Sequence, residues 1–260
     1  MIDEADAGVL KFSDVLAVRY REVTPPEALR EFVECLWVVG ADGSNPVSDG
    51  RILPDGRMDL VWIRGARVVI AGPQTRFTKR PRVRPLVAVG TRFHPGVLPV
   101  LLRLPAAEMV NGHVPLEAAD AQFGRRLNAG LDAARTPVQA MRAFVREIAR
   151  RIDEITAPDA AVAEAVSLLG VPGTSVAEAA RRVYLSERQL RRRFDERIGY
   201  GPKTLQRVLR FQRLKGMLER PDADLARAAL TAGYADQAHL TRECNELAGL
   251  TPSALAAWLR

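Results

Sequence analysis

The chain has 260 residues, of which 47% are hydrophobic and 27% are charged, so it can bury a substantial core and is not a disordered tail. This length allows one large domain or two ordinary ones. The net charge of +7 favours a polyanionic partner. The acidic start lacks the pattern of a signal peptide, and the apolar stretch 97–104 is too short to span a bilayer. We therefore expect a soluble, cytoplasmic protein.

The first hundred residues have the pattern of short strands separated by turns. Runs rich in β-branched and aromatic residues alternate with clusters of Gly, Pro, Asp and Asn. We predict strands at Val18–Val23, Cys35–Val39, Met58–Ile63, Arg67–Ala71 and Leu86–Phe93. Residues 25–34 predict a helix with proline in its first turn and with Leu29 and Val33 on its inner face.

After Gly96 the pattern becomes helical. Residues 120–133 and 137–152 predict two helices, the second capped by Thr136 and begun by Pro137. Pro and Asp in residues 153–160 mark a connection, which places a domain boundary near residue 157. We predict an α+β protein, with a strand-rich domain ending in helices at 1–157 and an all-α domain at 158–260.

The segment Ser175–Ile198 predicts a first helix-turn-helix unit. Ser175 caps a first helix, and Ser186 caps a second one on which Leu190, Phe194 and Ile198 recur every four residues. Three arginines occupy the opposite side of this second helix: Arg188, Arg191 and Arg192. One apolar face and one arginine-rich face suit a helix that enters the major groove of DNA.

A second unit repeats this plan after the helix predicted for Pro202–Leu218. Leu225–Ala232 predicts its first helix, and Gly233 ends that helix in a left-handed turn. Asp236 caps the second recognition helix, Gln237–Leu247. The first two turns of that helix expose the side chains expected to reach base edges: Gln237, Ala238, Thr241 and Arg242.

Residues 181–215 contain twelve Lys or Arg and three Asp or Glu, a net charge of +9. A basic block inside a folded segment indicates contact with nucleic acid, although a solvated helix surface is the alternative. Within this block, we assign Lys203 and Arg210 to DNA phosphates or to the junction between the two units.

Taken together, these residues make 174–258 resemble the DNA-binding domain of the AraC/XylS family of transcription regulators. The matching residues in the first part are Ala180, Ser186, Leu190, Phe194, Gly199 and Arg210. Those in the second part are Ala229, Gly233, Tyr234, Asp236, Gln237, Leu240, Arg242, Gly249, Thr251 and Pro252. The chain departs from the family pattern at Tyr184, where the family has a turn glycine, and at Cys244-Asn245.

The N-terminal half resembles the uncharacterised sensor-like domains that precede this DNA-binding domain in some family members. The resemblance rests on Arg51–Gly56, Asp59-Leu60 and Gly90–Gly96. It implies that the domain senses an effector or a partner, and Asp59, Trp62 and Arg92 are the candidates to line a pocket. The alternatives are a turn at Leu53–Gly56 and a structural Asp–Arg pair.

We find no motif of an enzyme, metal site or cofactor in this sequence, so we expect none of these. The two cysteines, Cys35 and Cys244, are interpreted as reduced, partly buried thiols. One rival is a DNA-repair alkyltransferase, which would need an activated cysteine, and another is a small-molecule binding protein without DNA. The expected partner is double-stranded DNA; RNA polymerase, a small-molecule effector and a second copy of the chain are further candidates.

Overall fold

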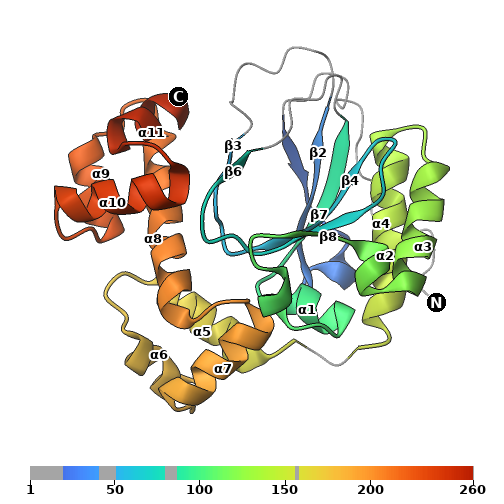
Figure 1. Cartoon of the computed structure of the whole chain (residues 1–260), viewed down its shortest axis with the longest axis horizontal. Helices are drawn as coiled ribbons and strands as arrows, with labels where there is room; N and C mark the ends of the chain where they lie inside the picture. The colour runs from blue at the N-terminus through green and yellow to red at the C-terminus, as the bar shows by residue number, and fades with distance from the viewer. Residues whose placement is uncertain (1–19, 41–50, 80–86, 156–157, 260) are drawn as a thin grey trace.

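The computed structural model describes residues 20–40, 51–79, 87–155 and 158–259. Its fold class is α+β, as predicted, with a strand-rich N-terminal part followed by helices (Figure 1). The N-terminal part carries a six-stranded antiparallel sheet in the order β1-β2-β7-β4-β5-β8 and a separate pair, β3-β6.

The strands are short, and their positions follow the predicted pattern. Their bounds are β1 Arg21–Val23, β2 Val33–Val39, β3 Arg51–Ile52, β4 Met58–Ile63, β5 Val69–Ala71, β6 Thr78–Lys79, β7 Ala88–Phe93 and β8 His113–Pro115. The prediction for Met58–Ile63 is confirmed at both ends. Residues 18, 19 and 86, which fall inside two predicted strands, lie outside the described residues. Three strands of two or three residues, β3, β6 and β8, were not predicted.

The helices of the N-terminal part follow the sheet strands or lie between them. Their bounds are η1 Glu27–Leu29 and η2 Ala106–Met109, which are 3-10 helices, and α1 Val97–Leu102, α2 Leu116–Ala119, α3 Ala121–Asp132 and α4 Pro137–Ile152. The helix predicted for 25–34 is wrong: only the η1 turn forms, and Val33 begins β2. The β-branched run that follows prefers the pleated sheet, and it continues the strand back to Val33. Leu29 and Val33 are nevertheless both buried.

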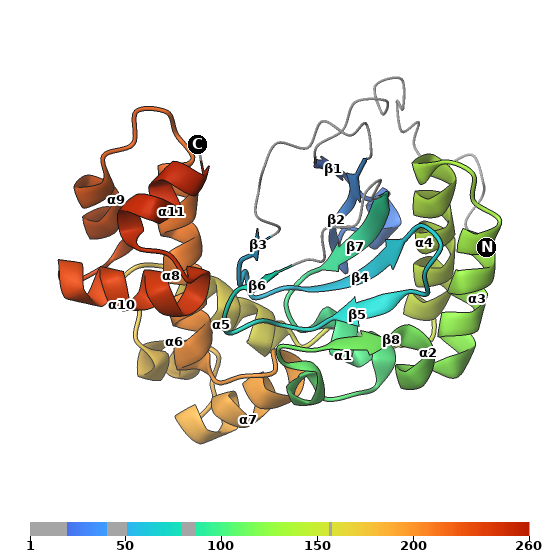
Figure 2. The ribbon, with the colours of Figure 1, turned by 45° about the horizontal axis from the view of Figure 1, so that its top comes forward.

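One face of the sheet is covered by helices, and this contact forms the main core. Leu36, Leu60 and Phe93 pack there against residues of α1, α3 and α4. The other face carries a smaller apolar cluster made by Cys35, Trp37, Val39 and Ala88. Figure 2 shows α3 and α4 against one side of the sheet.

The C-terminal part contains seven helices in its described residues. Their bounds are α5 Ala160–Gly170, α6 Val176–Arg182, α7 Glu187–Arg197, α8 Pro202–Leu218, α9 Leu225–Ala232, α10 Gln237–Ala248 and α11 Pro252–Leu259. The predicted helices Pro202–Leu218 and Leu225–Ala232 are confirmed at both ends. The proposed boundary at residue 157 lies outside the described residues.

The two helix-turn-helix units have separate cores, and α8 joins them. In unit one, α5, α6 and α7 pack around Leu190 and Phe194. In unit two, α9, α10 and α11 pack around Phe211 and Leu255. The N-terminal part, with its sheet and helices α1 to α4, is called the sheet domain below. It lies in the angle between the two units, beside α8 (Figures 1 and 2).

Candidate nucleic-acid interface

The second helix of unit one, α7, begins in a fully formed cap. The Ser186 hydroxyl accepts the Gln189 backbone N–H, and the Gln189 side chain accepts the Ser186 backbone N–H. This capping box satisfies two of the free donors that every helix start leaves. It fixes the first turn of α7, which carries Arg188.

The two faces of α7 separate as the sequence indicates. Leu190, Phe194 and Ile198 are at most 2% exposed and form the unit one core. Arg188, Arg191 and Arg192 are exposed, and none of them makes an ion pair with a described residue. Three unpaired guanidinium groups on one side of a rigid helix suit phosphate oxygens or guanine edges.

The second helix of unit two, α10, is also capped and has one apolar face. The Asp236 carboxylate accepts the His239 backbone N–H at 2.6 Å, and Leu240 and Leu247 are buried. Gln237, Ala238 and Arg242 are exposed. Thr241 is partly exposed, and its hydroxyl donates to the Gln237 carbonyl oxygen at 2.8 Å. At Cys244, where the sequence departs from the family pattern, the thiol fills a core position with no exposed surface.

The basic residues of α8 have two different environments: some bind unit two, and one is exposed to solvent. Arg207 and Arg210 on α8 both bind the buried Glu243 carboxylate of α10, at 3.1 and 2.6 Å. Arg210 also stacks over the ring of Tyr234, 5.3 Å from its centroid. Both partners of Arg210 belong to unit two, so its guanidinium lies at the junction of α8 with α10. Lys203 is exposed at the start of α8, near Gln206.

The Glu243 carboxylate is the electrostatic centre of that junction. Burial would raise its pKa, but the hydrogen bonds from Arg210 and Arg207 outweigh burial and hold the pKa below its usual range. His239 lies 3.4 Å from the same carboxylate. The orientation of α10 on α8 is thus set by charge-assisted hydrogen bonds as well as by apolar packing.

The three residues expected to line an effector pocket do not share one face of the sheet. Asp59 and Arg92 meet on neighbouring strands, with 3.3 Å between carboxylate and guanidinium. Trp62 faces the opposite way, into the main core with Met58 and Leu60. The aromatic residue beside Asp59 is Trp37 rather than Trp62, and the Trp37 indole N–H donates to the Asp59 carboxylate at 2.8 Å.

The polar cluster around Arg92 also includes carboxylates that the sequence did not single out. Arg92 forms ion pairs with Glu22 at 3.2 Å and Asp55 at 3.6 Å. Burial raises the pKa of Asp59 to about 6, although Arg92 opposes this rise. The Asp59 carboxylate and the Arg92 guanidinium thus lie together beside the loop that contains Asp55.

Neither cysteine has the environment of a nucleophile. Cys35 and Cys244 are both buried free thiols, and burial raises the pKa of each to about 12. A reactive cysteine needs the opposite shift. Among the described residues, no cluster of His, Cys, Asp and Glu could hold a metal ion. None of the described helices combines the length and apolar character that crossing a bilayer requires.

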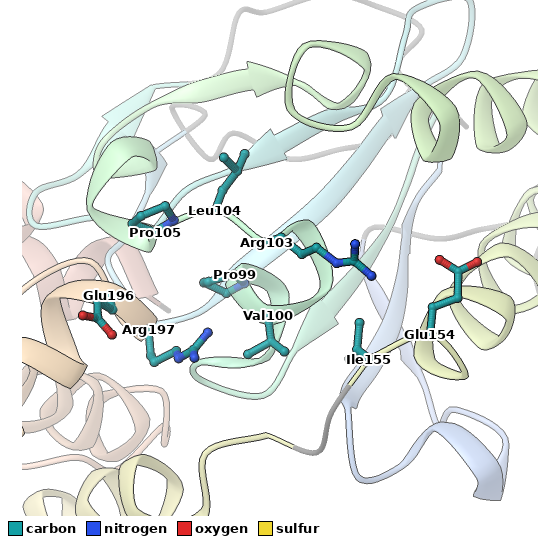
Figure 3. A pocket seen from close by; sticks show the side chains of 9 residues that line it. All are labelled: Pro99, Val100, Arg103, Leu104, Pro105, Glu154, Ile155, Glu196 and Arg197. Atoms are coloured by element: carbon teal, nitrogen blue, oxygen red, sulfur yellow. The ribbon is translucent and has the colours of Figure 1, made fainter.

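A cavity of about 460 Å³ lies where the sheet domain meets unit one (Figure 3). It is lined by Pro99, Val100, Arg103, Leu104, Pro105, Glu154, Ile155, Glu196 and Arg197. Two guanidinium groups and two carboxylates contribute to this lining. The cavity therefore has no net charge with which to select an anion or a cation.

Two family models match this chain. Residues 179–257 match a family described as a helix-turn-helix domain, and residues 21–115 match a domain of unknown function, DUF6597. The first match covers both candidate recognition helices, α7 and α10. The second covers the sheet domain from β1 to β8. No curated protein sequence shows significant similarity to the chain.

Solved structures of ToxT from Vibrio cholerae are among those that this chain is similar to. An apo lysine-to-alanine variant of ToxT is 10% identical, with 94% of this chain and 97% of that chain covered and a TM-score of 0.45. ToxT bound to an unsaturated fatty acid is 9% identical, with 92% and 94% covered and a TM-score of 0.43. Similarity at this level does not identify a ligand or a site.

Proposed function

We propose that the protein is a sequence-specific transcription regulator of the AraC/XylS type, which binds duplex DNA through α7 and α10 of the helix-turn-helix domain matched at residues 179–257. The observation that carries this proposal is the pair of capped helices, each with a buried apolar face and exposed polar side chains. On α7 those side chains are three arginines without ion-pair partners among the described residues.

The proposed division of labour separates base contacts from structural contacts. Arg188, Arg191 and Arg192 on α7 contact the first half-site, with Gln237, Ala238, Thr241 and Arg242 on α10 at the second. Lys203 neutralises a phosphate. Arg210 holds α10 on α8, because its guanidinium group is already engaged by Glu243 and by the Tyr234 ring.

Binding selection over randomised duplexes tests this division. If Arg191 or Arg192 binds a base, its replacement by Ala should weaken binding to the preferred site by about 1–3 kcal/mol. The same variant should also lose its preference for one base pair at the contacted position. Arg125→Ala, which removes an exposed arginine from α3, is the charge-matched control and should change neither. If both α7 variants keep the selected sequence of the wild type, unit one does not read bases.

The N-terminal domain is proposed to modulate DNA binding in response to a small effector or a partner. The polar cluster of Asp59, Arg92 and Trp37 supports this, because it offers a cation, an acceptor and an aromatic ring on one face of the sheet. A ligand at a hundred times its dissociation constant stabilises a domain by about 2.7 kcal/mol. Screening small metabolites by melting temperature tests the idea. A hit whose shift persists in Arg92→Ala would exclude the cluster as the site.

A further inference from the structure

A loop of the sheet domain is built into the contact with the DNA-binding part. This docking loop, Arg51–Arg57, includes the sequence motif that the N-terminal resemblance rests on. Its Leu53 side chain is 9% exposed and belongs to the unit two core, together with Val208 and Leu255. Its Pro54 carbonyl oxygen accepts a hydrogen bond from the Gln212 side chain on α8. Its Gly56 has φ +80°, and a Cβ there would lie 2.9 Å from Leu205 of α8.

Phe77, which precedes β6, extends this contact to the end of α10. A Cβ on Gly249 would lie 2.3 Å from the Phe77 ring, so the ring lies directly against the glycine that ends the helix. The Arg51 guanidinium stacks on the same ring, 4.6 Å from its centroid, and donates to the Ala248 carbonyl oxygen. Unit two is thereby attached to the sheet domain at the C-terminal end of its recognition helix.

Unit one is attached separately, through η2 and the residues around it. A Cβ on Gly199, which follows α7, would lie 2.8 Å from Val110 and 2.9 Å from Pro73. Val110 packs against the unit one core. The contact is again at the C-terminal end of a recognition helix, whereas Arg188, Arg191 and Arg192 on α7 remain exposed.

The docking loop is also held firmly on its own side. Asp55 pairs with Arg92 of β7, and Arg57 binds Glu34 of β2 at 2.7 Å. The Arg57 backbone N–H donates to the Asp55 carboxylate at 2.9 Å. The loop therefore links the central strands of the sheet to unit two through ion pairs and hydrogen bonds.

We propose that the sheet domain fixes the spacing of the two recognition helices, so that Leu53, Phe77 and Val110 help to determine operator specificity without touching DNA. The inference rests on the proposed DNA-binding function. Within the DNA-binding part the units are joined by α8, and any bending of α8 or rotation of unit two on it would change the distance between α7 and α10. Attaching both units to one rigid sheet removes that freedom, and with it the ability to match half-sites at other separations.

The test compares full-length wild type with Phe77→Ala, and with Val110→Ala as a second variant at the other attachment. Phe32→Ala is the matched control, because it removes a partly buried ring that packs only into the core of the sheet domain. Each protein is offered duplexes whose two half-sites are separated by the preferred spacer or by one or two base pairs more or less. Wild type and Phe32→Ala should prefer one spacer by about tenfold or more. The two attachment variants should prefer it by less than about threefold while binding a single half-site unchanged.

A second arm measures the spacing without DNA. Spin labels at Arg192→Cys and Arg242→Cys report the distance distribution between α7 and α10, since Cys35 and Cys244 are buried. The distribution should widen in Phe77→Ala and Val110→Ala and stay narrow in Phe32→Ala. Unchanged spacer preference and unchanged distributions in both attachment variants would overturn the inference. If wild type binds no duplex, the proposed function fails, and the distance arm alone decides whether the sheet domain sets the spacing.

Discussion

At the scale of single residues, Glu243 shows how a buried charge orients a recognition helix. Its side chain is 5% exposed and is shared by Arg207 and Arg210, whose own side chains are 34% and 15% exposed. Removing the charge in Glu243→Gln takes from Arg210 its carboxylate partner and leaves Arg207 with the exposed Glu246 alone. We expect the variant to lose about 2–3 kcal/mol of unfolding free energy at pH 7, less than for a fully buried pair because Arg207 is partly solvated.

The pH dependence of this contact has a definite sign. The pKa of Glu243 is lower in the folded protein than in the unfolded chain, so the stabilisation is fully present above the unfolded pKa and is lost as the pH falls below that value and through the folded pKa. Denaturant titrations of wild type and Glu243→Gln at several pH values should therefore converge in acid. Glu246→Gln, which removes a 59% exposed partner of Arg207, is the control and should cost less than about 1 kcal/mol.

Tyr184 is a second residue whose conformation predicts a measurable effect. It occupies the turn before α7 with φ +57° and is 95% exposed. A left-handed conformation costs a residue with a Cβ roughly 1–2 kcal/mol, and glycine avoids most of that cost. Tyr184→Gly should raise the unfolding free energy by about 0.5–1 kcal/mol. Tyr184→Ala, which keeps the Cβ, should leave it unchanged, and a gain of equal size in Ala would argue against strain as the cause.

The pairing of Asp59 with Arg92 was one of the two alternatives that the sequence left open, and Trp62 does not join this pair. Residues three apart on a strand point to opposite faces, so alternation along Met58–Ile63 already separates Asp59 from Trp62. Trp37 lies on another strand, 22 residues from Asp59. Its hydrogen bond to Asp59 depends on the order of the strands in the sheet, which a local sequence pattern does not predict.

At the scale of elements, several C-terminal helices could be predicted closely because a capping residue marks where each of them begins. Ser175, Ser186, Asp224 and Asp236 all cap helices through their side chains. The helix predicted at 25–34 failed because residues 33–39 form a stronger strand pattern. Strands of two or three residues, such as β3 and β6, are too short to show alternation at all.

The cap of α7 provides a prediction at this scale. Ser186→Ala removes the acceptor for the Gln189 backbone N–H and should cost about 1 kcal/mol, whereas Ser186→Gly should cost only a few tenths. Hydrogen exchange at the first amides of α7 measures the fraying directly. Because Arg188 lies in this turn, Ser186→Ala should also weaken DNA binding. An α7 that exchanges no faster in Ser186→Ala than in wild type would contradict the assigned role of the cap.

At the scale of the whole molecule, the two domains are less separate than their sequence patterns indicate. The unit two core includes Leu53 and contacts Phe77, both from the sheet domain. Such contacts between distant segments leave no periodic signal, so the sequence favoured a simple turn for Leu53–Gly56. The match of residues 21–115 to a family model marks the sheet domain as a unit but does not show what it touches.

This contact changes what we expect of the isolated fragment 158–260. The fragment retains most of the core residues of both units and all of the unpaired arginines on α7, so it should fold and bind DNA with an affinity that falls steeply with salt. Without Leu53 and Phe77, α10 and α11 should exchange amide hydrogens faster than in the full chain. Equal exchange in fragment and full chain would mean that the sheet domain adds nothing to unit two.

The distance along the chain between the two sides of the docking contact has a consequence for synthesis. Pro54 and its partner Gln212 are separated by 158 residues. A ribosome that adds about 5–20 residues per second needs roughly 8–30 s to make that stretch. During this interval Leu53 and Phe77 have left the ribosome while their partners on α8 and α10 do not yet exist. The nascent sheet domain therefore exposes the apolar side chains of Leu53 and Phe77 until the last third of the protein emerges. A chaperone that binds exposed apolar side chains is expected to act during this interval.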